Sequence, residues 1–250
     1  MPKFFISQEQ QENDKIHIKG NDVNHIRNVL RKKVGETIVV CNKESKKDYL
    51  CKIENIENNS IECKIEEELE SNVESNVKVT IMQGLPKKDK MELIIQKSVE
   101  LGVYEIIPIE MERCVVKLQE KDKLKKIERW QKISEVAAKQ CGRDFIPKIN
   151  QIMSLKNICN LLSEYDIVLL AYENEEKTTI KEALKSIKSK FIGKQIKIAV
   201  IIGPEGGISE KEVELLKKSG AITISLGKRI LRTETVALNV LSVIMYELEN

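Results

Sequence analysis

From about residue 77 to the end of the chain, apolar runs alternate with amphipathic segments. Runs such as "VKVTIMQGL" (77–85), "DIVLLAYE" (166–173) and "KIAVII" (197–202) are largely apolar on both faces. Helical patterns lie between and after these runs, among them "KKDKMELIIQKSVELG" and "SEKEVELLKKSG". Strands that are buried on both faces and joined by helices form parallel sheets. The sequence therefore predicts an α/β domain over residues 73–250, with helices on both faces of a parallel sheet.

The first 72 residues have a different hydrophobic pattern. Short β-branched or alternating runs occur at "KIHIKG" (15–20), "ETIVVCN" (36–42), "YLCKIENI" (49–56) and "SIECKIEEEL" (60–69). Strands of this length and spacing suggest a small barrel. The polar, turn-rich stretch "EEELESNVESN" follows, so we place the domain boundary near residue 72, between domains 1–72 and 73–250.

A helix is expected between the first two of these strands. Val23, Ile26, Val29 and Leu30 would share one face of a helix over residues 21–34. Asn21 or Asp22 is a suitable N-cap, and Gly35 would end the helix.

Composition excludes several classes of protein. The chain has 250 residues, 42 Lys and Arg against 39 Asp and Glu, six cysteines without a C-x-x-C pair, and two histidines. A metal site is therefore not expected, and the scattered thiols suggest a reducing compartment. No apolar run approaches 18 residues and the N-terminus lacks a secretory pattern, so we expect a cytoplasmic protein without a membrane span.

The segment "IIGPEGGISEKEV" (201–213) joins an apolar strand to a helix through a glycine-rich loop. It matches neither the dinucleotide nor the P-loop fingerprint. Ser209 and Glu212 form a capping box that uses the N-terminal donors of the helix, and Glu205 places a negative charge in the loop. Both features disfavour a phosphate and favour a neutral or cationic ligand, although for this loop alone a tightly packed turn is the better explanation of the glycines.

Two further loops leave strands at the same predicted edge. "SLGKRILRTETVALNV" leaves a strand at Gly227 and places Arg232 and Glu234 before the last helix, with Thr233 or Thr235 as its N-cap. "LLAYENEEK" brings Tyr172 and Glu173 to that edge, where an ordinary acidic loop is the simpler interpretation. Because ligands of parallel sheets bind at the carboxyl ends of the strands, the three loops together predict a binding site.

Taken together, "IIGPEGGISEKEV" and "LGKRILRTETVAL" resemble the methyltransferases that modify N3 of a uridine in 16S ribosomal RNA, members of the SPOUT superfamily. Three other segments are similar to that family and occur in its order: "HIRNVLR" (25–31), residues 87–116, and "ERWQKISEVAAKQCGRDFIP" (128–147). One departure is Val236, where the family pattern leads us to expect alanine.

The resemblance implies a parallel sheet with a deep trefoil knot, preceded by a PUA-like β-barrel domain. It also implies S-adenosylmethionine as cofactor, a donor with a sulfonium and an ammonium group and no phosphate. The residues carried over for cofactor binding are Gly203, Glu205, Gly206, Gly207, Leu226, Gly227, Ile230 and Leu231, with Leu170 and Ala171 less firmly.

For catalysis the resemblance points to Arg232, which would stabilise developing negative charge or hold a phosphate, and to Glu234, which would orient the site. No histidine lies in residues 73–250, so the proton acceptor is either Glu234 or solvent. Candidates for RNA contact are His25, Arg27, Arg31, Arg113 and Arg143. The spacing of the first three does not place them on one helical face, so they would not all contact RNA together.

The expected activity is methylation of N3 of a specific uridine in 16S rRNA by a homodimer that acts on the small ribosomal subunit. Two alternatives stay open. One is a related SPOUT enzyme that methylates a ribose 2′-hydroxyl or another RNA, and the other is a ribosome-assembly factor that binds RNA without catalysis.

Overall fold

The computed structural model describes residues 3–70, 73–188 and 194–249. It divides into two compact units, each of two segments. The first unit combines residues 1–74 with 138–146, and the second combines residues 75–137 with 147–250. The boundary expected near residue 72 did not foresee that a later segment joins the first unit.

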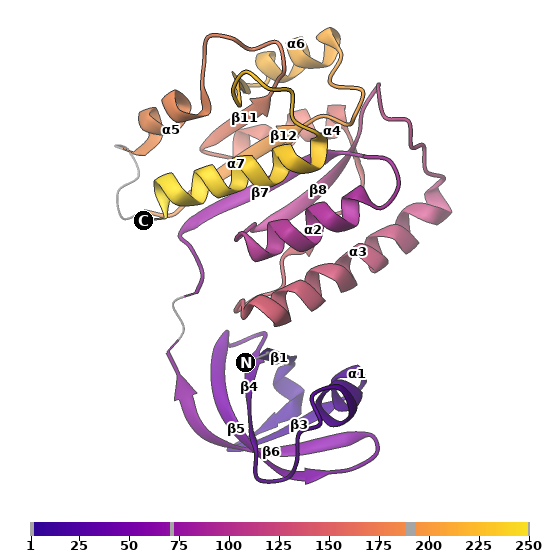
Figure 1. Ribbon diagram of the computed structural model, residues 1–250, viewed down its shortest axis with the longest axis vertical. Helices are drawn as coiled ribbons and strands as arrows, with labels where there is room; N and C mark the ends of the chain where they lie inside the picture. Colours follow the sequence, from indigo (N-terminus) through magenta and orange to yellow (C-terminus); the bar gives the residue numbers. More distant parts are fainter. Residues whose placement is uncertain (1–2, 71–72, 189–193, 250) are drawn as a thin grey trace. The chain divides into compact units, whose positions relative to one another are not determined.

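The first unit is built on a six-stranded sheet in the order β1-β4-β5-β6-β3-β2, whose strands curl in Figure 1. β1 runs parallel to β4, and the other neighbours are antiparallel. The strands are β1 (Lys3–Ile6), β2 (Gln11–Glu12), β3 (Lys15–Lys19), β4 (Thr37–Asn42), β5 (Lys47–Ile56) and β6 (Ser60–Leu69), with a short helix η1 (Gln8–Gln10). Alternation along them buries Ile16, Ile18, Ile61 and Cys63 in a common core.

The helix expected over residues 21–34 is shorter and less regular. α1 (Asn21–Asn24) continues as a π-helical turn, η2 (His25–Val29), in which the Leu30 amide donates to the His25 carbonyl. A π-turn adds a residue per turn and so shifts the side chains that follow. Ile26 is therefore buried as predicted, whereas Val29 is 64% exposed and that prediction is wrong.

Both predicted ends of that helix are wrong as well. The N-cap is Gly20, at φ +74°, rather than Asn21 or Asp22. Gly35 lies beyond the helix in a separate turn, where its amide donates to the carbonyl of Ile53.

The second unit contains the predicted parallel sheet. Its seven strands run β10-β8-β7-β12-β11-β13, with β9 also paired to β8, and every pairing is parallel. The strands are β7 (Val77–Gly84), β8 (Glu105–Glu110), β9 (Lys148–Ile149), β10 (Met153–Ser154), β11 (Ile167–Ala171), β12 (Ile196–Ile202) and β13 (Ile222–Ile224). The parallel α/β sheet is confirmed, and the knot stays a prediction.

Helices cover both faces of this sheet (Figure 1). α2 and α5 each pack against α7 on one face, and α4 packs against α6. The helices are α2 (Lys90–Glu100), α3 (Glu120–Cys141), α4 (Leu155–Leu161) with η3 (Leu162–Glu164), α5 (Ile180–Lys188), α6 (Glu210–Lys218) and α7 (Thr233–Leu248). Among the described residues, none of the helices has the length and apolar character that crossing a membrane requires.

Candidate active site

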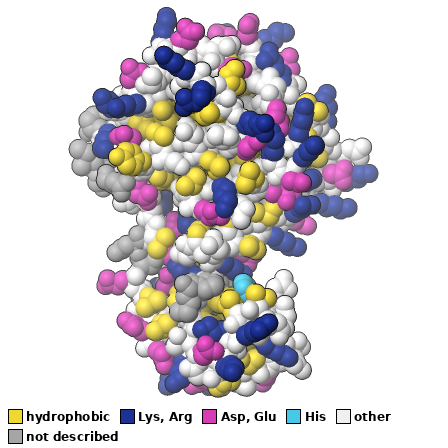
Figure 2. All heavy atoms as spheres, viewed as in Figure 1, with side chains coloured by type: hydrophobic (Ala, Val, Ile, Leu, Met, Phe, Trp, Pro, Cys, Tyr) yellow, Lys and Arg dark blue, Asp and Glu magenta, His cyan; other side chains and the backbone are white. Residues whose placement is uncertain are grey.

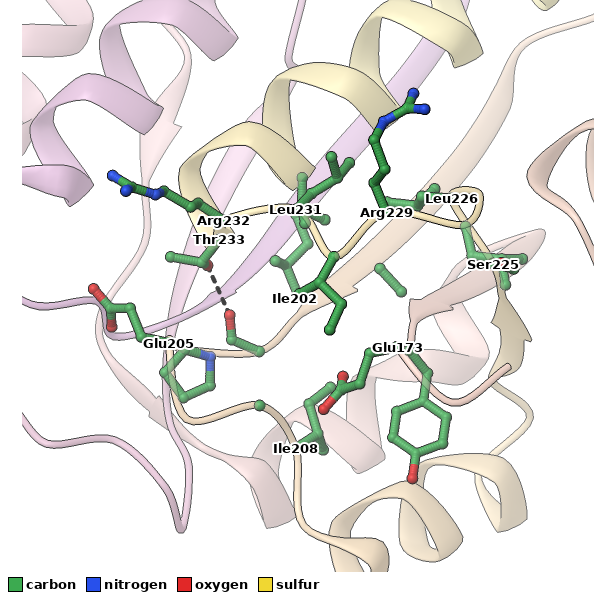
Figure 3. A pocket seen from close by; sticks show the side chains of 18 of the residues that line it. Glu173, Ile202, Glu205, Ile208, Ser225, Leu226, Arg229, Leu231, Arg232 and Thr233 are labelled. Atoms are coloured by element: carbon green, nitrogen blue, oxygen red, sulfur yellow. Dashed lines mark hydrogen bonds between the residues drawn. The ribbon is translucent and has the colours of Figure 1, made fainter. Parts of the chain in front are cut away.

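The three suspected loops meet at the carboxyl ends of β11, β12 and β13, which lie side by side in the order β12-β11-β13. They enclose a cavity of about 530 Å³ (Figure 3). The lining comes from residues 171–173, 202–208 and 224–233, together with Lys90 and Val236. Three segments that are far apart in the sequence therefore form one site, at the edge where parallel sheets bind ligands.

The loop after β12 is tightly packed. A Cβ on Gly203 would lie 2.7 Å from Ile208 Cγ1, and a Cβ on Gly207 would lie 2.5 Å from Glu173 Oε1. Gly207 also has φ +72°, a conformation that side chains disfavour. The predicted capping box is present, since the Ser209 hydroxyl accepts from the Glu212 amide at the start of α6.

Glu205 has partners within the protein. Its two carboxylate oxygens accept from the Lys87 amide at 3.0 and 3.2 Å, and Oε1 lies 3.1 Å from Lys90 Nζ. Lys90 Nζ is also 3.1 Å from Glu234 Oε2. Partial burial raises the pKa of Glu205, but hydrogen bonds from its own amide, Lys87 and Lys90 outweigh burial, so the net pKa is lowered. The same contacts, first with Glu205 and then with Glu234, raise the pKa of Lys90.

The buried side-chain amide of Gln83 connects the loop after β12 to α7. Gln83, at the end of β7, donates from Nε2 to the Gly203 carbonyl at 3.4 Å and to Thr233 Oγ1 at 2.8 Å. Thr233 Oγ1 in turn donates to the Gly203 carbonyl at 2.7 Å. The N-cap position of α7 is occupied by Arg232, so the prediction of Thr233 or Thr235 is wrong. This network fixes the backbone from which Arg232 projects.

Most residues predicted for the site lie together. Those that line the cavity are Ala171, Gly203, Glu205, Gly206, Gly207, Leu226, Gly227, Ile230, Leu231 and Arg232. Leu170 is buried within β11 and does not line the cavity. Glu234 is not a lining residue either, and it reaches the cavity only through its ion pair with Lys90.

The five candidates for RNA contact have different surroundings. Arg113 lies at the loop after β12, where its Nη1 donates to the Gly206 carbonyl. Arg143 belongs to the first unit, its side chain is 6% exposed, and Nε and Nη2 donate to Glu74. The structure therefore gives Arg143 a buried structural role and speaks against its predicted contact with RNA.

The other three candidates lie in the helical segment of the first unit. His25 is half-buried, with its ring edge-on to Phe4 at a centroid distance of 5.8 Å. Arg27 is exposed and donates to Asn58, and Arg31 is exposed with φ +53°.

Several polar residues of the cavity were missed or dismissed, namely Lys90, Tyr172, Glu173, Ser225, Lys228 and Arg229. Lys90 was considered only as part of an amphipathic helix, although a helix that follows β7 begins at the edge where the loops meet. Glu173 was placed at that edge, but an ordinary loop was preferred. The order of the strands would have been needed to bring either residue into the site.

Comparison with known proteins agrees with this architecture. A family model described as an RNA methyltransferase domain matches residues 73–245, and one described as an RNA methyltransferase PUA domain matches residues 18–66. The chain is 37% identical over 252 residues to ribosomal RNA small subunit methyltransferase E of Bacillus subtilis, covering 100% of this chain and 98% of that protein.

Two solved structures are similar over nearly the whole chain. One is a methyltransferase of Legionella pneumophila in complex with the bound cofactor SAM, with 32% identity, a TM-score of 0.85, and coverage of 98% of this chain and 96% of the other. The second is a ribosomal RNA small subunit methyltransferase E of Neisseria gonorrhoeae bound to S-adenosyl methionine, with 29% identity, a TM-score of 0.84, and coverage of 98% and 97%. The sequence, the PUA-type first unit and the three-loop cavity lead to one conclusion: this chain belongs to the RNA methyltransferase family.

Proposed function

We propose that the protein methylates N3 of a specific uridine in 16S rRNA of the small ribosomal subunit, with S-adenosylmethionine as methyl donor. The observation that carries the proposal is the cavity at the ends of β11, β12 and β13, in a chain that matches a ribosomal RNA small subunit methyltransferase over its full length. Two similar structures contain this donor.

The cavity suits such a cofactor in size and in chemistry. Its volume of about 530 Å³ is within the range of small-molecule sites, roughly 300–1,000 Å³. Apolar side chains of Ile202, Leu226 and Leu231 line it, and glycines at 203 and 227 allow a ligand to approach the backbone closely. The capping box occupies the start of α6, which makes a phosphate group a poor fit there. When bound, the cofactor would supply an electrophilic methyl group.

The chain's own residues would orient the target base and stabilise its charge. Uracil N3 becomes a nucleophile when its proton leaves, and negative charge then spreads to the two carbonyl oxygens, O2 and O4. Arg232 is exposed at the N-cap of α7 and lines the cavity, so its guanidinium is suited to stabilise this charge. Glu234 is paired with Lys90, which favours a positioning role for Glu234 and leaves solvent to accept the proton.

Substrate access sets a further requirement. N3 lies on the pairing edge of uracil, so the base must be unpaired or turned out of a helix. The PUA-type first unit, with the exposed Arg27 and Arg31, would contribute RNA affinity, and Arg113 would contribute beside the cavity. Such contacts to phosphates would weaken as salt concentration rises.

We also propose that the protein acts as a homodimer in the cytoplasm, where ribosomes are modified. Support for self-association comes from exposed apolar side chains in the second unit: Ile230 is 89% exposed, and Tyr246 on α7 is 74% exposed. Figure 2 shows hydrophobic side chains exposed on this face of the second unit among lysines and arginines. Light scattering of the purified protein would give a mass near twice 28.6 kDa.

The test of the activity is transfer of labelled methyl groups to small ribosomal subunits from cells that lack the gene, followed by mass spectrometry of the nucleosides. We expect label in 3-methyluridine, and none in subunits from cells that carry the gene. Label in a 2′-O-methylated nucleoside would contradict the N3 assignment. Cofactor and RNA binding without any transfer would instead indicate an assembly factor.

A further inference from the structure

The cavity contains one carboxylate, Glu173, that makes no ion pair with a described residue. The nearby Arg113 guanidinium donates to the Gly206 carbonyl instead, and its Nη1 would be 3.6 Å from a Cβ on Gly207. Among the described residues that line the cavity, two are acidic, Glu173 and Glu205. Glu205 accepts from the Lys87 amide and pairs with Lys90, so its charge is used to hold the loop after β12. Glu205 is therefore poorly suited to be the acid that a cationic ligand meets, contrary to the expectation from the sequence.

Glu173 differs from Glu205 in each respect. In the described parts of the chain it makes no hydrogen bond and no ion pair, and it follows directly after the end of β11. Figure 3 shows its carboxylate turned toward the interior, between Ile202 and Ile208, whereas Arg229 and Arg232 extend away from it. The carboxylate also lies against the Gly207 backbone, because a Cβ there would be 2.5 Å from Oε1.

This arrangement favours a cation inside the cavity. Glu173 is exposed as a residue, but it lines the cavity and its carboxylate lies beside the buried side chains of Ile202 and Ile208, so a cation at this place would meet an acid that has no partner. Contact with Ile202 and Ile208 would remove part of the water around a cation that reaches Glu173, and such a loss is unfavourable unless an opposite charge is present.

We propose that the Glu173 carboxylate recognises the positive charge of the methyl donor and thereby determines the preference of the site for S-adenosylmethionine. The proposal rests on the proposed function, because it assumes that this cavity binds the donor. The positive charges available on that donor are its ammonium and its sulfonium. Glu173 is thus a binding residue that the sequence placed at the edge without assigning it a role.

The experiment is calorimetric titration of the full-length wild type and of Glu173→Gln with three nucleosides. S-adenosylmethionine carries both charges, S-adenosylhomocysteine carries only the ammonium, and 5′-methylthioadenosine carries neither. The matched control is Glu176→Gln, an exposed acid on the same loop that does not line the cavity. Melting temperatures of both variants would show that each is folded.

We expect Glu173→Gln to weaken S-adenosylmethionine binding about tenfold or more, as for loss of a charge-assisted contact, while 5′-methylthioadenosine binding and the control stay unchanged. A parallel loss for S-adenosylhomocysteine would assign the contact to the ammonium, and its absence would assign it to the sulfonium. Unchanged affinity for S-adenosylmethionine, or equal loss for all three nucleosides, would overturn the proposal. A wild type that binds none of them would instead refute the proposed cofactor.

Discussion

Arg232 and Arg229 lie three residues apart, both are exposed, and both line the cavity, but the structure gives them different settings. Arg232 is the N-cap residue of α7 and precedes Thr233, which is anchored to Gly203 and Gln83. Arg229 lies in the loop before α7, and no hydrogen bond anchors the residue that follows it among the described residues. An arginine on an anchored backbone is better suited to meet charge that develops at one place.

We therefore expect Arg232→Gln to lower kcat by roughly 10²- to 10³-fold, the usual effect of removing one donor that stabilises transition-state charge. Binding of S-adenosylmethionine should stay close to that of the wild type. Arg229→Gln is the control and should affect RNA affinity more than kcat. Single-turnover methylation and calorimetry separate these effects, and loss of cofactor affinity alone in Arg232→Gln would show a structural role.

A second prediction concerns Lys90, whose ammonium group forms ion pairs with both Glu205 and Glu234. Without it, Glu205 and Glu234 would lose their shared counter-charge, and the loop after β12 and the first turn of α7 would lose a common contact. Lys90→Met should lower kcat by about tenfold or more, since small displacements of site residues are costly, and Lys90→Arg should retain part of the activity. Equal activity in Lys90→Met and wild type would contradict this positioning role.

The pH dependence of that ion pair has a definite sign. Because the folded pKa of Glu205 is lowered from 4.5, its contribution to stability is present above 4.5 and is lost as pH falls through the folded pKa. Because the folded pKa of Lys90 is raised from 10.5, its contribution is present below 10.5 and is lost as pH rises beyond the folded pKa. The melting temperatures of wild type and Lys90→Met should therefore differ by a constant amount at neutral pH and converge in acid.

At the residue scale, the sequence indicated which loops form the site but did not indicate which side chains form ion pairs with one another. Glycines and charges after apolar strands indicate loops at one sheet edge, and these loops do line the cavity. The partner of Glu205 could not be predicted, because Lys90 comes from a different strand–helix unit. The burial of Arg143 was equally hidden, since its partner Glu74 lies in a segment expected to be a polar linker.

At the element scale, α6 begins with an unusually well-connected cap. The Ser209 hydroxyl accepts from the Glu212 amide and donates to Glu112 Oε2 at 2.8 Å, and Glu212 Oε1 accepts from the Glu112 amide. The cap therefore joins α6 to the segment that follows β8, and the next residue of that segment, Arg113, donates to the Gly206 carbonyl in the glycine loop of the cavity.

Ser209→Ala should destabilise the protein by about 1–2 kcal/mol, the upper part of the range for loss of an N-cap, because two carboxylates also lose a shared hydroxyl. Ser219→Ala, at the other end of α6, should change stability by less than about 0.5 kcal/mol. Urea denaturation of the three proteins measures both values. A smaller effect at Ser209 than at Ser219 would show that the cap is not important for α6.

Periodicity predicted several regular elements well. The buried face of α2 and the strands β7, β11 and β12 follow directly from their patterns. The segment over residues 21–34 failed because the π-turn changes the repeat within the helix, which a 3.6-residue pattern does not capture.

At the scale of the whole molecule, the chain returns to its first unit after most of α3. Residues 138–146 belong to that unit, where Lys139 pairs with Asp22 and Arg143 pairs with Glu74. Composition indicated a domain boundary near residue 72 but did not indicate that residues 138–146 pack in the first unit. Ion pairs between residues far apart in the sequence leave no pattern in either segment. Family resemblance supplied the order of the domains, whereas the packing of this segment came only from the structure.

Substitution of the buried Lys3 would test how strongly residues 138–146 stabilise the first unit. Lys3 Nζ lies 2.5 Å from Asp48 and 2.5 Å from Asp144, and the lysine side chain is 6% exposed. Burial lowers the pKa of Lys3, but hydrogen bonds to Asp144 and Asp48 outweigh it, so the net pKa is raised. Lys3→Met would leave two carboxylates buried without their counter-charge, which typically costs about 3–5 kcal/mol.

The matched control for Lys3→Met is Lys15→Met, which removes an exposed pair with Glu62 and should leave exchange close to that of the wild type. Hydrogen exchange is the suitable measurement, because it reports each unit separately in a two-unit protein. Lys3→Met should speed exchange in β1, β4 and residues 138–146 together, while β7 and β12 keep their protection. If only β1 lost protection, the Lys3–Asp144 ion pair would not couple the segment to the sheet, and other contacts, such as the ion pairs of Arg143 and Lys139, would hold residues 138–146.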